Sequence, residues 1–126
     1  MVIDTSAIVA ILLGEPQAER LAEAIEQGAP RRLSAASLLE ASIVIEARKG
    51  EDGVRDLDLL VYRSGIEIVP FDEEQSQVAR LAWRRYGKGR HPAGLNLGDC
   101  FSYALAKVTG SALLYIGKDF SQTDVA

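Results

Sequence analysis

The chain has 126 residues, with 14 Lys and Arg, 18 Asp and Glu and one His, which gives a formal net charge of −4 and a sequence pI of about 5.0. This length predicts a single domain over residues 1–126, and 48% hydrophobic with 25% charged residues is typical of a globular rather than a disordered protein. We expect no membrane association and a cytoplasmic location, because no apolar run approaches the roughly 20 residues that span a bilayer, no basic leader precedes the N-terminal apolar stretch, and a single Cys cannot form an internal disulfide.

Two residue counts narrow the possible chemistry further. The single His91 and the single Cys100 exclude a zinc site built from several His or Cys, and they speak against a Ser-His-Asp triad. The acidic charge argues against a nucleic-acid partner, because phosphates repel a negative surface.

The first half of the chain predicts a short strand and a series of helices. Residues 1–3 are apolar and end at Asp4-Thr5-Ser6, residue types that favour a helix N-cap. Gly14 and Gly50 end predicted helices, and Pro16 fits the first turn of another. The expected elements are a strand at 1–3, helices at 7–13 and 17–27, a strand at 31–35, and helices at 37–49 and 51–63.

The second half continues this alternation. Ile66-Glu67-Ile68-Val69 alternates apolar and charged residues and ends at Pro70, as a strand does. The expected elements are a strand at 66–69, a helix at 72–86 with Val78, Leu81 and Ala82 inward, a loop at 87–97, a helix at 96–108, a buried strand at 112–116 and a polar tail at 117–126. Strands that alternate with helices predict an α/β fold with a mainly parallel sheet covered on both faces.

Four acids stand where this fold would bring them together. Asp4 and Asp119 follow the first and last strands, and Glu40 and Asp99 lie in the first turns of two predicted helices. Functional sites of parallel sheets form at the carboxyl edge of the strands, so we expect these acids to converge there.

Each acid also has a simpler structural interpretation. Ser37-x-x-Glu40 and Asn96-x-x-Asp99 match helix-capping patterns. Asp4 can cap the first helix, and Asp119 can begin a turn. A structural protein with four such acids would require several coincidences.

Converging carboxylates point to a metal site. Carboxylates that crowd together repel each other, and some take up protons unless positive charge compensates them. Helix N-termini supply part of that charge, and a divalent cation supplies more. With no Cys or His cluster, a site built from oxygen atoms alone favours Mg²⁺, with Mn²⁺ as a substitute. Such a site suits phosphodiester hydrolysis, in which the metal activates water and offsets charge on the phosphate.

The segments around these acids resemble the PIN-domain ribonucleases, and specifically the VapC-type toxins of type II toxin–antitoxin systems. The resemblance rests on an ordered set: Met1-Val2-Ile3-Asp4-Thr5-Ser6-Ala7, Leu38-Leu39-Glu40-Ala41, Asn96-Leu97-Gly98-Asp99-Cys100 and Gly117-Lys118-Asp119-Phe120-Ser121-Gln122-Thr123-Asp124. It implies a three-layer α/β/α sandwich and a Mg²⁺-dependent endoribonuclease. It also implies a homodimer that a small VapB-like antitoxin protein inhibits.

The same resemblance implies a role for each acid. Asp4 and Asp99 match the metal ligands of the family, and Ser6 matches a hydroxyl near the metal. Glu40 matches the base or the acid that orients the attacking water. Asp119 completes the catalytic set.

The fourth acid has two candidates. The family often has another acid or an amide at the position of Lys118, and this departure leaves the assignment open. Asp119 lies one short turn after the last predicted strand, and Asp124 is its rival in the tail.

A basic segment lies directly before Asp99. No acid occurs between Glu74 and Asp99, and the basic side chains there include four that we expect to bind RNA: Arg84, Arg85, Lys88 and Arg90. Cations that bind phosphates and planar groups that stack on bases are what an RNA site needs. The alternative is a solvated helix face, and for Trp83 alone we expect packing in the core.

Two other functions stay open at this point. A phospho-receiver signalling domain has a similar length and an acidic Mg²⁺ pocket. However, it needs adjacent acids after the first strand, where this chain has Asp4-Thr5-Ser6, and an acceptor Asp after a middle strand, whereas Asp56 and Asp58 lie in a helical pattern. A PIN-fold module that binds RNA without cutting it is the second alternative.

Overall fold

The computed structural model describes residues 1–125 and contains a parallel sheet of four short strands in the order β3-β2-β1-β4. The central strand β1 (Val2–Ile3) pairs with β2 (Arg32–Ser34) on one side and with β4 (Leu113–Leu114) on the other, and β2 pairs with β3 (Glu67–Val69). The chain order reverses between β1 and β4, and open α/β sheets form their sites at the carboxyl edge beside such a reversal.

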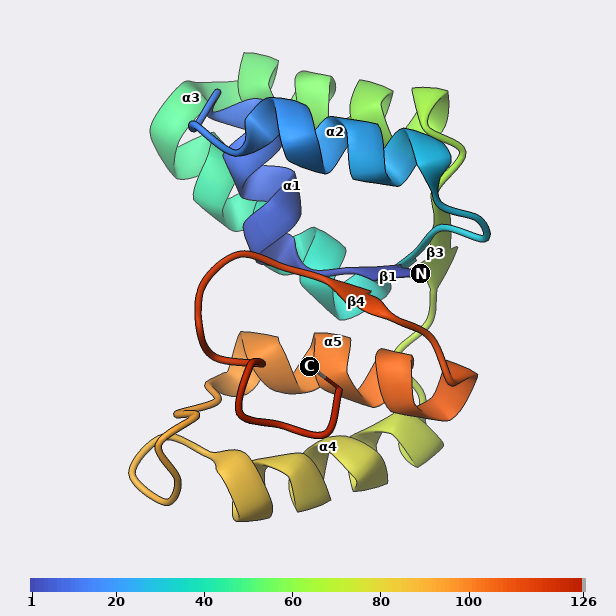
Figure 1. Ribbon diagram of the computed structural model, residues 1–126. Helices are drawn as coiled ribbons and strands as arrows, with labels where there is room; N and C mark the ends of the chain where they lie inside the picture. The colour runs from blue at the N-terminus through green and yellow to red at the C-terminus, as the bar shows by residue number, and fades with distance from the viewer. Residues whose placement is uncertain (126) are drawn as a thin grey trace.

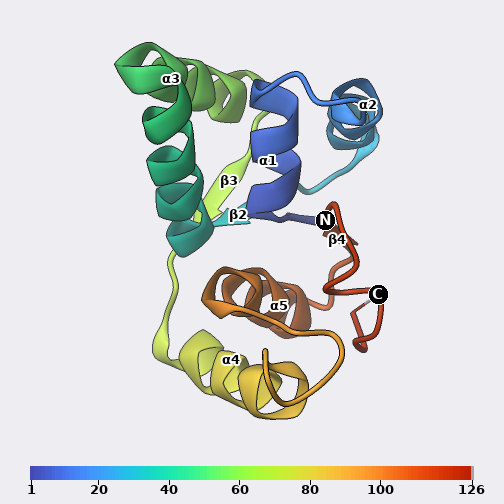
Figure 2. The same cartoon turned by 90° about the vertical axis from the view of Figure 1, so that its left-hand side faces the viewer.

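Five helices cover the two faces of this sheet. Figures 1 and 2 show α1 (Thr5–Leu12), α2 (Ala18–Gln27) and α3 (Ala35–Arg63) on one face, and α4 (Glu73–Tyr86) and α5 (Leu97–Thr109) on the other. This arrangement confirms the predicted three-layer α/β/α sandwich with a parallel sheet. Within residues 1–125, no helix is long and apolar enough to cross a membrane.

The two residues of β1 divide the core between the faces. Ile3 packs with apolar side chains of α1, α2 and α3, whereas Val2 packs with Leu105 and Ala106 of α5. Successive side chains of a strand point to opposite faces. Asp4 stands two residues after Val2, so its side chain points to the same face as that of Val2, toward α5. This places the Asp4 carboxylate next to α5.

Helix α3 differs from the predicted pair of helices. It is one element from Ala35 to Arg63, kinked at Gly50, where φ is +67° and ψ is −162°. Only glycine adopts this backbone region readily, so the predicted break at Gly50 is present as a kink.

The start of α3 corrects the predicted capping box. Ser34 is the N-cap, and its Oγ accepts a hydrogen bond from the Ala36 N–H at 3.2 Å. Ser37 is fully buried inside the helix, with its Oγ 3.4 Å from Ser102 Oγ. The predicted Ser37–Glu40 box is therefore wrong, and Glu40 lies in the second turn, where its carboxylate is not used by a cap.

The inward face of α4 also differs from the prediction. Ala82 is buried and Val78 is half-buried, but Leu81 is 58% exposed and Trp83 is 44% exposed. The buried face of α4 has two alanines between two larger side chains, all at helical spacing: Gln75, Ala79, Ala82 and Tyr86. The prediction of Trp83 in the core is wrong.

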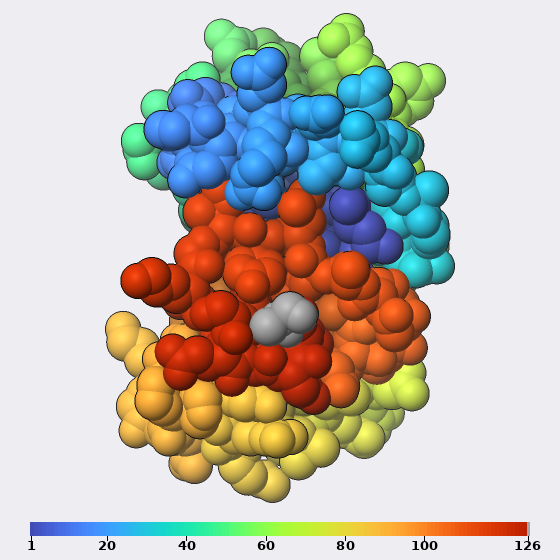
Figure 3. All heavy atoms as spheres, in the orientation of Figure 1, coloured from blue at the N-terminus to red at the C-terminus, as the bar shows by residue number. Residues whose placement is uncertain are grey.

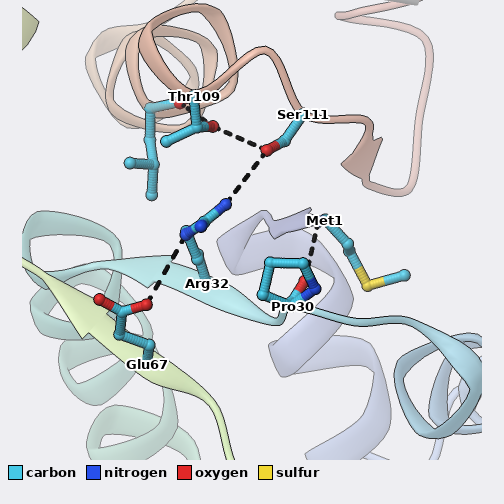
Figure 4. A network of polar contacts seen from close by, with 7 residues as sticks. Met1, Pro30, Arg32, Glu67, Thr109 and Ser111 are labelled. Carbon is cyan, nitrogen blue, oxygen red and sulfur yellow. Dashed lines mark hydrogen bonds and ion pairs between the residues drawn. The ribbon is translucent and has the colours of Figure 1, made fainter.

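The opposite, amino edge of the sheet has its own polar network (Figure 4). Arg32 of β2 forms an ion pair with Glu67 of β3 (Nε–Oε1, 3.6 Å) and donates a hydrogen bond to Ser111 Oγ at 3.5 Å, before β4. The N-terminal ammonium donates to the Pro30 carbonyl at 2.8 Å. These contacts join the amino ends of all four strands, far from the acids that follow β1 and β4.

Candidate active site

Asp4 is held by three hydrogen-bond donors. It is the N-cap of α1, and its Oδ2 accepts from the Ser6 backbone N–H at 3.0 Å and from Ser6 Oγ at 2.6 Å. Its Oδ1 accepts from Ser102 Oγ of α5 at 2.5 Å. The residue is only 4% exposed, so these bonds fix a buried carboxylate in one position.

Ser6 joins Asp4 to the end of β4. Its Oγ accepts a hydrogen bond from the Ile116 N–H at 3.0 Å while it donates to Asp4. The serine therefore ties the segment after β4 to the segment after β1, at the point where the strand order reverses.

One carboxylate oxygen of Asp99 accepts a hydrogen bond that caps a helix, and the other oxygen is not used by the cap. Asn96 is the predicted cap of α5, and with Asp99 it forms a reciprocal capping box, in which the Asn96 N–H donates to Asp99 Oδ2 at 3.0 Å and the Asp99 N–H donates to Asn96 Oδ1 at 2.9 Å. The capping interpretation from the sequence is confirmed. It does not exclude a second role, because the box uses only one oxygen of a side chain that faces other acids.

Asp119 and Asp4 lie beside Asp99. Burial raises the pKa of Asp99 to about 7; the Asn96 backbone bond opposes this shift, and a shared hydrogen bond with Asp119 and the charges of Asp119 and Asp4 add to it. This is the protonation that the sequence predicts for crowded carboxylates. The structure thus brings together acids from three segments that are distant in sequence.

The position of Asp119 depends on its neighbour. Phe120 is buried among α4 and α5 residues and packs edge-on against Tyr115, with ring centroids 5.1 Å apart. Figure 3 shows this tail, in red, lying against the yellow and orange atoms of α4 and the loop that follows it. A segment predicted only as a polar tail is therefore anchored, with Asp119 on the side of the acids.

Glu40 approaches the same region from α3. Its carboxylate lies against the backbone of Gly98, because a Cβ built at Gly98 would overlap Glu40 Oε2 and lie 2.6 Å from Oε1 and Cδ. Gly98 directly precedes Asp99. A glycine at this position lets the Glu40 side chain reach the first turn of α5.

Asp124 is placed elsewhere. Its Oδ1 accepts from Tyr103 Oη at 2.6 Å, and its Oδ2 pairs with Lys107 Nζ at 2.8 Å. Burial acts to raise the pKa of Asp124, but the bonds from Lys107 and Tyr103 outweigh it and hold the pKa below its ordinary value. Of the two candidates for the fourth acid, Asp119 is the one that the fold brings to Asp99.

Ser102 is a residue of this site that the sequence reasoning missed. It is fully buried, and it connects Asp4 to α5. Its signal was the spacing: Ser102 stands three residues after Asp99 and three before Leu105, on the stripe of α5 that faces the sheet.

The side chains present suit a small divalent cation. Residues 1–125 contain no preformed group of three or more His, Cys, Asp or Glu side chains spaced to hold a metal ion. Mg²⁺ does not need one, because it keeps several waters and binds through one or two carboxylates. Asp4 and Asp99 offer oxygen donors only, and a divalent cation bound there would favour the charged form of Asp99, whose pKa is raised to about 7 by burial and by its neighbours Asp119 and Asp4.

The predicted basic segment is exposed beside this site. Arg84, Arg85, Lys88 and Arg90 are all exposed on the end of α4 and the following loop. The Arg85 guanidinium lies 5.0 Å from the centre of the Tyr86 ring, and that of Arg90 lies 4.3 Å from the centre of the Trp83 ring. The segment therefore presents its cations together with one exposed ring, Trp83, whereas Tyr86 is buried.

Comparisons with known proteins assign the family. The PIN domain family matches residues 1–126. The chain is 60% identical over 126 residues to a Ribonuclease VapC of Mycolicibacterium smegmatis (100% of this chain, 98% of the relative) and 56% identical to Ribonuclease VapC30 of Mycobacterium tuberculosis (100% and 96%). The chain is a PIN domain of the VapC family. This assignment contradicts the phospho-receiver alternative, and Asp56 and Asp58 are exposed on α3 rather than at a strand end.

Solved structures confirm the fold of this VapC family member. Mycobacterium tuberculosis VapC20, described as a Sarcin-Ricin loop cleaving toxin, matches with a TM-score of 0.76 at 16% identity, over 95% of this chain and 92% of the other. A toxin–antitoxin complex from Klebsiella pneumoniae matches with a TM-score of 0.74 at 18% identity, over 98% and 92%.

Proposed function

We propose that this chain is a metal-dependent endoribonuclease toxin that hydrolyses RNA phosphodiester bonds. The observation that carries the proposal is the meeting of Asp4, Asp99 and Asp119 at the point where the strand order reverses. The relatives support it, because proteins 56–60% identical over the whole chain are named ribonucleases.

Each acid then has a distinct task. Asp4 and Asp99 would hold Mg²⁺, or Mn²⁺ in its place, which supplies Lewis acidity to offset charge on the phosphate. Ser6 and Ser102 keep Asp4 aimed at the site through their hydrogen bonds. Glu40 or Asp119 orients the attacking water toward the phosphorus and accepts its proton.

The basic segment would bind the substrate strand. Arg84, Arg85, Lys88 and Arg90 are exposed, and the loop that contains the last two leads into α5 and Asp99. Phosphates bound along this segment would bring the next part of the RNA backbone to the acids.

A protein partner and a second copy complete the proposal. We expect a small VapB-like antitoxin to inhibit the chain, and the structural similarity to a chain of a toxin–antitoxin complex supports this expectation. We also expect a homodimer in the cytoplasm. Two large apolar side chains of α3 beside Glu40, Leu39 and Ile43, are exposed and offer a surface for protein contacts.

The test is RNA cleavage by the purified chain. We expect cleavage with Mg²⁺, none with EDTA, and a loss of at least about 100-fold in the Asp4→Asn and Asp99→Asn variants. Asp56→Asn, an exposed acid of α3, is the matched control and should cleave like the parent. Full cleavage by either site variant would overturn the assignment, and RNA binding without cleavage by the parent would favour the non-catalytic alternative.

A further inference from the structure

A cavity of about 420 Å³ opens between α4 and the first turns of α5, the helix that contains Asp99. Three aromatic rings line it, with Leu97, Ala79 and Arg80 between them: Phe71, Trp83 and Phe101. Pockets for small-molecule ligands run from roughly 300 to 1,000 Å³, so this one has room for a single flat group.

The aromatic rings that line this cavity are held in place by contacts with their neighbours. Phe71 and Phe101 pack edge-to-face with centroids 5.0 Å apart. Trp83 is 44% exposed and is held by the Arg90 guanidinium over its ring instead of by the core. An exposed Trp with a fixed orientation offers a stacking surface at a low cost in conformational entropy.

The charge around the cavity indicates the kind of ligand. The 24 residues from Gln75 to Gly98 contain no acid and five cations: Arg80, Arg84, Arg85, Lys88 and Arg90. An apolar aromatic wall surrounded by cations complements a flat apolar base attached to a phosphate backbone. An apolar protein helix would use the wall but not the cations.

The cavity also adjoins the hollow in which Glu40 lies. Leu97 and Phe101 line both this cavity and the neighbouring hollow that contains Glu40 and Gly98. Leu97 stands two residues before Asp99 on the same helix. A strand whose phosphate lies at the acids therefore has a neighbouring base within reach of the cavity.

We propose that this cavity binds one unpaired nucleobase of the RNA substrate, stacked on Trp83 and Phe101, next to the phosphate that is cut. The inference rests on the proposed ribonuclease function. The cavity would require that the RNA be unpaired next to the cut phosphate, because a base can enter the cavity only where it is free of its pairing partner. The acids alone do not impose this requirement.

Trp83 is the only tryptophan of the chain, so its fluorescence reports directly on the cavity. The experiment titrates the Asp99→Asn variant, which we expect to bind RNA without cutting it, with a short single-stranded RNA, the same sequence as a duplex, and inorganic polyphosphate. We expect saturable quenching of Trp83 by the single strand and little change with the duplex or polyphosphate.

Variants separate stacking from charge. Trp83→Ala should weaken single-strand binding by roughly 5- to 100-fold and leave its salt dependence unchanged, whereas Trp83→Phe retains most of the affinity. Arg84→Ala with Arg85→Ala should instead reduce the salt dependence. Tyr62→Ala, which removes an exposed aromatic ring on α3, is the matched control and should bind like the parent.

The outcomes distinguish this inference from the function on which it rests. If the parent chain cuts RNA but Trp83 is not quenched and Trp83→Ala binds and cuts normally, the cavity assignment is overturned and the ribonuclease stands. If Trp83 emission changes with protein concentration alone and RNA has no effect, a second copy covers the cavity, and the assignment is also overturned. If the parent does not cut RNA, the proposed function itself fails.

Discussion

Asp99 serves two purposes that conflict. As part of a capping box it stabilises the start of α5, but as a buried carboxyl beside Asp119 and Asp4 it has a pKa near 7. Capping needs only one oxygen acceptor, which an Asn also supplies. The charged carboxylate therefore costs stability at this position, which fits the catalytic role that we propose for Asp99.

The metal-free stability of an Asp99→Asn variant tests this conflict. The unfolded chain releases the Asp99 proton near pH 3.8, and the folded chain keeps it to about pH 7. Between these values the folded state binds more protons, so this group's contribution to stability is present at low pH and is lost as the pH rises to 7.

We expect the stability of the parent relative to Asp99→Asn to fall by an amount on the order of 1–4 kcal/mol between pH 4 and pH 8, measured by urea unfolding in EDTA. Added Mg²⁺ should restore the parent at pH 8 and leave the variant unchanged. Parallel pH curves for the two proteins would contradict the crowding of these acids.

Ser102 is the second residue whose role can be measured. Its hydroxyl is fully buried and donates to Asp4 Oδ1, so Ser102→Ala leaves that carboxylate held only by the two bonds from Ser6 to Oδ2. We expect cleavage about tenfold slower and a higher Mg²⁺ concentration at half-maximal rate. Ser42→Ala, which removes a hydroxyl bonded to Leu38 O within α3, is the control. A normal rate with normal Mg²⁺ dependence in Ser102→Ala would show that Asp4 is held well enough by Ser6.

At the scale of elements, the site depends on where helices begin. Asp4 could be predicted because a two-residue strand directly precedes it, and Asp99 because Asn96 marks a helix start. The sequence predicts Glu40 in the first turn of this helix, whereas it lies in the second, because Ser37 imitates a cap three residues after the true one at Ser34. Local patterns locate elements well, but tertiary packing decides which of two serines caps a helix.

The approach of α3 to α5 makes a testable contact. A methyl group at Gly98 would displace the end of the flexible Glu40 side chain without displacing backbone. If Glu40 acts from that position, Gly98→Ala should slow cleavage about as much as Glu40→Ala, while thermal stability changes little. The double variant should be no slower than either single variant, because both remove the same contribution. Additive losses would indicate that Gly98 matters for another reason.

At the scale of the whole molecule, the distribution of charge matters more than its total. The four proposed catalytic acids carry a formal charge equal to the entire net charge of −4. In the segment from Gln75 to Gly98, by contrast, all of the Arg, Lys, Asp and Glu residues are Arg or Lys. The acidic pI is therefore weak evidence against RNA. The order of strands explains this division, because it gathers acids at one edge and leaves α4 and its loop to contact solvent.

The parallel sheet and its helix layers could be predicted from alternating strand and helix patterns. The exposure of Trp83 could not be predicted, because it depends on how α4 packs against α5 through its alanines. The sequence of α4 alone also allows Val78 and Leu81 to face inward. The cavity beside Trp83 needs both helices and appears only in the folded chain.

In the proposed mechanism, Asp4 and Asp99 share one divalent cation at the point where the strand order of the sheet reverses. Crystals of the parent and of Asp99→Asn soaked in Mn²⁺, with anomalous diffraction recorded for both, test it most directly. We predict an anomalous peak at the carboxylates of Asp4 and Asp99 in the parent and none there in the variant. A parent that cuts RNA with Mn²⁺ but shows no peak at these carboxylates, or an equal peak in both crystals, would contradict the claim.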